Sequence, residues 1–136
     1  MHRILYISTA RDPLSDKQID AILATSRRNN RRADVTGCLV IGGRRFLQVL
    51  EGPQEAVEQT FARISTDQRH SAIVKLNDKS IDDRSFGNWA MGFERGGEAA
   101  ADASLTDQVF ALLAPVTDPN LRAYFMGFAR SHDKAA

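Results

Sequence analysis

The sequence of 136 residues contains a single cysteine and only three histidines, which are scattered along the chain. Because a disulfide needs two cysteines, none forms within the chain, and no cysteine–histidine spacing typical of a metal site is present. We therefore expect no bound metal. Cys38 lies in an apolar run, which predicts a buried core residue rather than a reactive thiol. A lone cysteine also fits a reduced, cytoplasmic setting.

The motifs of several protein classes are missing as well. The sequence has no glycine-rich phosphate loop and no Ser-His-Asp arrangement, so a hydrolytic enzyme has no support. Its apolar runs are too short to cross a bilayer, and the strand-like N-terminus leaves no room for a signal peptide. With 18 Lys and Arg against 17 Asp and Glu, the formal net charge is +1. We therefore expect neither a membrane nor nucleic acid as a partner.

The residues that are present are typical of one globular domain, with 43% hydrophobic and 26% charged residues. Apolar periodicity and turn residues predict five strands and four helices. We expect the strands at 3–8, 35–41, 45–50, 72–76 and 89–93. The helices are expected to begin after Ser15, Pro53, Ser104 and Asp118, and the first of them to end near Asn30.

This order, βαββαββ followed by two helices, predicts an α+β, ferredoxin-like fold with two helices on one face of the sheet. We expect residues 1–95 to form the main domain and residues 96–136 to form a C-terminal helical extension packed on it. Gly96 and Gly97 are expected to act as a hinge between the two parts. The apolar stripe of the last helix is expected to include Leu121, Tyr124 and Phe125.

Two polar residues stand where the apolar pattern predicts core. In a ferredoxin-like sheet the first and third strands are central neighbours, and Tyr6 and Gln48 lie in the middle of these strands. A buried amide without a hydrogen-bond partner costs about 1–3 kcal/mol, and Tyr6 is one available partner for Gln48. The alternative is that Tyr6 only packs and Gln48 points to solvent. The pattern alone favours neither interpretation.

Asn29 and Asn30 form a second polar pair, at the expected end of the first helix. An amide offers a donor and an acceptor together, which suits the edge of a flavin, a nucleobase or another amide. The pattern alone favours the simpler role of a helix cap. Trp89 and Met91 are expected on one face of the last strand, where a core role is the more common one.

The end of the first helix is strongly basic, with arginines at positions 27, 28, 31 and 32. Such a cluster can attract a phosphate or RNA. A solvated helix end is the more common interpretation, and cations near a helix C-terminus are also favoured by the helix dipole.

Taken together, these features resemble the BLUF family of flavin-binding blue-light sensors. The resemblance covers roughly residues 3–93, and its motifs follow one another in the family's order. They are Tyr6-Ile-Ser8, Thr25-Ser-Arg-Arg-Asn-Asn30, Val35-Thr-Gly37, Phe46-Leu-Gln-Val-Leu-Glu-Gly52, Asp67-Gln-Arg-His70, Arg84-Ser-Phe86 and Trp89-Ala-Met91.

The resemblance implies that residues 1–95 hold FAD, or FMN, without a covalent bond and with the ring between the first two helices. It implies photochemical roles for Tyr6 and Gln48 and signal transmission through Trp89 and Met91. The flavin contacts that it implies are Ser8, Ile22, Asn29, Asn30, Gln48, Ile64, Asp67, Arg69 and His70. A surface position for His70 is the alternative that the residues leave open.

The resemblance further implies a reversible photoreceptor without substrate turnover. Its output would pass through the last strand and the C-terminal helices to a downstream protein partner or to a homodimer or higher oligomer. Two alternative functions remain: a flavin-free ferredoxin-like module that binds a partner or RNA, and a small flavin enzyme.

Overall fold

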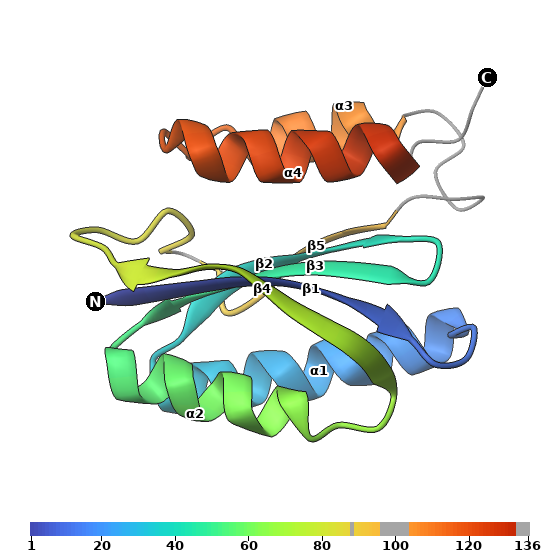
Figure 1. The fold of residues 1–136 in the computed structure, drawn as a ribbon, viewed down its shortest axis with the longest axis horizontal. Coiled ribbons are helices and arrows are strands. Elements are labelled where there is room, and N and C mark those ends of the chain that lie inside the picture. The colour runs from blue at the N-terminus through green and yellow to red at the C-terminus, as the bar shows by residue number, and fades with distance from the viewer. Residues whose placement is uncertain (88, 96–103, 133–136) are drawn as a thin grey trace.

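The chain folds into one five-stranded sheet with a pair of helices on each face (Figure 1). The computed structural model describes residues 1–87, 89–95 and 104–132. The strands are β1 (His2–Ala10), β2 (Thr36–Gly42), β3 (Arg45–Gly52), β4 (His70–Ser80) and β5 (Gly92–Arg95). The helices are α1 (Asp16–Ala33), α2 (Gln54–Ser65), α3 (Leu105–Leu112) and α4 (Pro119–His132).

The strand order is β4-β1-β3-β2-β5, so β1 and β3 lie side by side near the centre, as a ferredoxin-like fold requires. They pair antiparallel, with Tyr6 opposite Gln48. Gly43 has a φ of 58°, a left-handed conformation that glycine adopts easily, at the turn between β2 and β3. The predicted α+β ferredoxin-like architecture is therefore confirmed.

Helices α1 and α2 cover one face of the sheet (Figure 1). The predicted capping box at Ser15 is present, because its hydroxyl accepts from the backbone of Gln18 and the Gln18 side chain accepts in return. The predicted end of α1 near Asn30 is wrong, since the helix continues to Ala33. Asp34 ends it instead, in a left-handed conformation with a φ of 58°.

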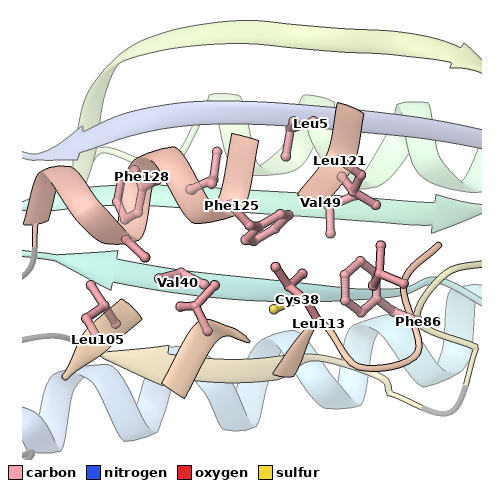
Figure 2. Packing of buried hydrophobic residues seen from close by; sticks show 14 residues of the cluster. Leu5, Cys38, Val40, Val49, Phe86, Leu105, Leu113, Leu121, Phe125 and Phe128 are labelled. Atoms are coloured by element: carbon pink, nitrogen blue, oxygen red, sulfur yellow. The ribbon is translucent and has the colours of Figure 1, made fainter. Parts of the chain in front are cut away.

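Helices α3 and α4 cover the opposite face of the sheet (Figure 1). Figure 2 shows the core beneath them, in which α4 places Leu121, Phe125 and Phe128 against residues of the central strands. Tyr124 does not join this core, because its side chain is 41% exposed. Cys38 is fully buried here, as its apolar surroundings predicted.

The two outer strands differ from their predicted ranges. β4 spans His70–Ser80 rather than 72–76, because its polar residues continue to pair with β1 along the outer edge of the sheet. β5 begins only at Gly92, where its parallel pairing with β2 starts opposite Cys38. Trp89 and Met91 therefore precede the strand.

The expected hinge at Gly96 and Gly97 lies outside the described residues. In the part of the chain that the structure describes, no helix has the length and apolar character needed to span a bilayer.

Candidate functional site

A pocket opens between α1, α2 and the face of the sheet that these helices cover. Nine of its lining residues were predicted from the sequence: Tyr6, Ile22, Asn29, Asn30, Gln48, Ile64, Asp67, Arg69 and His70. The remaining lining residues are Thr25, Ser26, Leu39, Phe46, Thr60 and Arg63.

Gln48 is a buried polar group in the lining of the pocket, with 5% of its surface exposed. Its Oε1 accepts a hydrogen bond from the hydroxyl of Tyr6, and its Nε2 lies 3.4 Å from Sδ of Met91. The solvent-facing alternative for Gln48 is therefore wrong. Both ends of the amide are engaged, one by a phenol and one by a thioether, which is a weak acceptor.

Tyr6 is buried, with 2% of its surface exposed. Burial raises the pKa of the Tyr6 phenol well above its ordinary value of 10.0, and the negative charge of Asp67 raises it further. The phenol therefore stays protonated at neutral pH and donates a hydrogen bond to Gln48. Phe61 on α2 packs edge-on against the ring, with 5.3 Å between centroids, and fixes its orientation.

Asn30 is buried inside α1 and does not cap the helix. Its Nδ2 donates to the carbonyl of Ala90 at 2.7 Å. One turn earlier, Nε of Arg27 donates to the carbonyl of Met91 at 3.0 Å. Helix α1 thus binds the segment that leads into β5 through hydrogen bonds to two adjacent carbonyls. Arg27 is therefore not part of a solvated basic surface.

His70 is buried at the start of β4, so the surface alternative is wrong. Its Nε2 lies 2.7 Å from the carbonyl oxygen of Ile64 and must donate, since a carbonyl only accepts. In the neutral ring, Nδ1 then accepts from the hydroxyl of Ser8 at 2.9 Å. Ser8 does not itself line the pocket and reaches it only through His70.

The mouth of the pocket carries charged groups of both signs. Asp67 and Arg69 form an ion pair that is closed by two further hydrogen bonds of 3.0 Å from Nε of Arg69. The hydrogen bond from Arg69 lowers the pKa of the Asp67 carboxyl, which stays ionised. Arg63 on α2 adds a second guanidinium to the lining.

The expectation that Trp89 and Met91 share one face is wrong. Met91 is buried with the residues packed under α1 and α2, whereas Trp89 packs against the core under α3 and α4. The Trp89 ring lies 5.6 Å from the ring of Phe86, centroid to centroid. The period-two alternation of a strand does not hold here, because residues 89–91 bend and are held by side chains of α1.

Two of the lining residues that the sequence analysis missed follow from the sheet. Leu39 is the register partner of Gln48 on β2, and Phe46 is two residues before Gln48 on β3. The alternation of strands places both on the same face as Gln48. Thr25, Ser26, Thr60 and Arg63 are polar helix residues, and only the packing of the two helices brings them to the pocket.

The lining has the chemistry needed for a planar heteroaromatic ring. Ile22 and Ile64 come from the two helices as apolar walls, and amides of Asn29, Asn30 and Gln48 offer donors and acceptors between them. In the described part of the chain, no group of three or more His, Cys, Asp or Glu side chains is placed to hold a metal ion.

Comparison with known proteins points in the same direction. The family model described as BLUF, sensors of blue-light using FAD, matches residues 1–92. The blue light- and temperature-regulated antirepressor BluF of Escherichia coli (strain K12) is 38% identical over 88 residues. These are 65% of this chain and 22% of that protein. The photoactivated adenylate cyclase subunit beta of Euglena longa is 29% identical over 116 residues, which are 85% of this chain and 12% of that protein.

Solved structures show the same fold. The dark-state structure of BlrB, a BLUF protein, is 30% identical, with a TM-score of 0.71 and a match over 96% of each chain. A structure of Klebsiella pneumoniae BlrP1 with FMN and cyclic diGMP is 27% identical, with a TM-score of 0.74. That match covers 93% of this chain and 34% of BlrP1.

Proposed function

This chain belongs to the BLUF family, sensors of blue light that use FAD, and we propose that it is a reversible photoreceptor without substrate turnover. The observation that carries the proposal is the buried hydrogen bond from Tyr6 to Gln48, both of which line the pocket. A phenol and an amide in this arrangement can change their hydrogen bonding without any net chemical reaction.

We assign the binding of FAD, or of FMN, to the pocket between α1 and α2. Ile22 and Ile64 would form the apolar walls of the ring. Asn30 would bind its pyrimidine edge with help from Asn29. One N–H of Asn30 donates to the carbonyl of Ala90, and its side-chain oxygen would act as the acceptor. His70, Asp67 and Arg69 would lie along the chain that leads to the phosphate.

A bound flavin supplies a strong electron acceptor when it absorbs blue light. In our proposal Tyr6 would be the electron donor, and Gln48 would relay the phenol proton, since its oxygen already accepts the phenol hydrogen bond. Both would return to Tyr6, and the Gln48 amide would remain rotated or tautomerised. Because the two ends of an amide differ chemically, either change alters the hydrogen bond that Gln48 offers into the pocket. Nothing is consumed.

We propose that the output passes from this site to the C-terminal helices, which would belong to the same domain as residues 1–95. Met91 touches Gln48 and Trp89 packs against the core of α3 and α4, so two residues of one short segment contact both layers. The receiver would be a separate protein or another copy of this chain. Phe110 on α3 and Tyr124 on α4 are exposed large side chains that such a partner could cover.

The absorption spectrum of the purified chain supplied with FAD, before and after blue light, tests this function. We expect a flavin spectrum that moves to longer wavelength under blue light and returns in darkness. A flavin that bleaches and stays reduced would support a redox enzyme. A protein that remains colourless in the presence of FAD would contradict the proposal and support the flavin-free binding module.

A further inference from the structure

The two central strands carry a second cross-strand pair on the face opposite the pocket. Arg3 lies opposite Glu51 in the same β1–β3 register that places Tyr6 opposite Gln48. Arg3 is three residues before Tyr6 on β1, and Glu51 is three residues after Gln48 on β3. Side chains of a strand alternate between the two faces of the sheet, so residues three apart point to opposite faces. Arg3 and Glu51 therefore lie under α3 and α4.

Both side chains of this second pair are buried, with 3% of Arg3 and none of Glu51 exposed. Nη1 of Arg3 lies 3.9 Å from Oε2 of Glu51, and its Nη2 donates to Oδ2 of Asp118 at 2.8 Å. Burial raises the pKa of the Glu51 carboxyl, whereas the backbone N–H groups of Phe86 and Ser85 and the charge of Arg3 lower it and favour its ionised form. Removing one partner of a buried ion pair is strongly destabilising. We call Arg3, Glu51 and Asp118 the charged latch.

Asp118 connects the latch to the start of α4. Its Oδ1 accepts from the backbone N–H groups of Asn120 at 2.9 Å and Leu121 at 3.3 Å, which caps the helix. Its other oxygen, Oδ2, binds Arg3 on β1. The hydrogen bond from Arg3 lowers the pKa of Asp118, so this carboxylate stays charged.

Glu51 connects the latch to the segment before Trp89. Its Oε1 accepts from the backbone N–H groups of Ser85 at 2.8 Å and Phe86 at 2.9 Å. The ring of Phe86 contacts the ring of Phe125 on α4, with 6.1 Å between centroids. Glu51 therefore holds the polypeptide at a point that packs directly against α4.

We propose that the charged latch is a set of positioning residues that transmits a change in the pairing of β1 and β3 to the docking of α4. The inference rests on the proposed photochemistry of Tyr6 and Gln48. The geometry supports it, because the Tyr6–Gln48 pair and the Arg3–Glu51 pair lie on the same two strands in the same register. Of these two pairs, the second is bonded to the start of α4, through Arg3 and Asp118. A shift of β1 against β3 cannot leave the Arg3–Glu51 pair unchanged.

The experiment is amide hydrogen exchange of the full FAD-loaded chain, in darkness and under blue light, read over Pro119–His132. Asp118→Asn is the main variant, since asparagine keeps the cap on α4 but loses the charge that pairs with Arg3. Glu51→Gln is the second, because it keeps an acceptor for Ser85 and Phe86. Asp107→Asn in the first turn of α3 is the matched control.

In the wild type we expect illumination to accelerate exchange in α4. Asp118→Asn and Glu51→Gln should accelerate it in darkness by about fivefold or more, which is the lower range of measured couplings between sites, and should reduce the effect of light. The wild-type spectral shift should persist in both variants, and Asp107→Asn should behave as the wild type.

A wild-type spectral shift without any effect of light on α4 would overturn the latch, as would variants that keep the full effect of light. A wild type that shows no spectral shift would instead be a failure of the proposed function. The two failures are therefore distinguishable in one set of samples.

Discussion

Gln48 has one strongly held end and one weakly held end. Its oxygen accepts from Tyr6, a good donor, whereas its nitrogen donates to the thioether of Met91 at 3.4 Å. Sulfur is a weak acceptor, so exchange of that partner for a better acceptor in the pocket costs little. The weakly held nitrogen is therefore the end of the amide that is free to respond to a ligand.

The burial of Tyr6 gives a prediction about alkaline titration. The chain has two tyrosines, and Tyr124 is exposed while Tyr6 is buried. Since burial raises the pKa of Tyr6 above 10.0, we expect the Tyr6 phenol not to titrate near pH 10 in the folded protein. Ultraviolet absorption of phenolate in Tyr124→Phe, where Tyr6 alone remains, measures this directly.

The sign of the linkage follows from the same shift. Above the unfolded pKa of 10.0 the folded state binds one proton more than the unfolded state, so stability falls as the pH rises further. Tyr124→Phe should therefore show no phenolate until it unfolds. A reversible titration near pH 10 in the folded variant would contradict the burial of Tyr6.

At the scale of elements, α4 is held to the sheet mainly by its apolar face. Phe125 is fully buried in the core shown in Figure 2, whereas Phe110 on α3 is 61% exposed. Phe125→Ala should lower the free energy of unfolding by about 3–5 kcal/mol, because it removes a large buried side chain and leaves a cavity. Chemical denaturation measures the change.

Phe110→Ala is the matched control for that prediction. The ring of Phe110 contacts the guanidinium of Arg122 at 5.7 Å but fills no part of the core. We expect a loss below about 1 kcal/mol. Equal losses in the two variants would mean that α4 does not dock through the face that Phe125 presents.

The sequence predicted the order of these elements but not every boundary. Caps at Ser15, Ser104 and Asp118 are local signals, and the structure has all three. The start of β5 was missed because the residues before it are held by tertiary contacts from α1 to the carbonyls of Ala90 and Met91. Such contacts leave no periodic trace in the sequence.

Some features of the candidate site were also indicated by the sequence, and others were not. The apolar run around Gln48 made a buried amide with Tyr6 as its partner one of two open interpretations, and the structure shows that this one is correct. The opposite directions of Trp89 and Met91 were not predictable, because alternation along a strand would have placed them on one face. Polar residues of α1 and α2 that line the pocket depend on how two helices pack.

At the scale of the whole molecule, the sheet separates the layer of α1 and α2, where we propose that flavin binds, from the layer of α3 and α4, which we propose carries the output. The pocket lies under α1 and α2, and the core of α3 and α4 lies on the other face (Figure 1). Among the described residues, those of the sheet and of the segment leading into β5 contact both layers. A signal that starts in the pocket must therefore cross the sheet, either through residues 89–91 or through the pairing of β1 with β3.

The pocket also predicts a dependence of global stability on FAD. A ligand that binds only the folded state stabilises it by about 2.7 kcal/mol at about 100 times its Kd. We expect FAD to raise the melting temperature accordingly and ADP, which lacks the ring, to leave it unchanged. Scanning calorimetry of the chain with each ligand measures both, and an equal rise with ADP would place binding outside the pocket between α1 and α2.

The most direct test of the central claim is the light-minus-dark absorption spectrum of the FAD-loaded wild type beside Gln48→Leu. We predict a reversible shift to longer wavelength in the wild type and no shift in Gln48→Leu, although the variant still binds flavin. A variant that binds flavin and shifts like the wild type would show that the Tyr6–Gln48 hydrogen bond is not the switch.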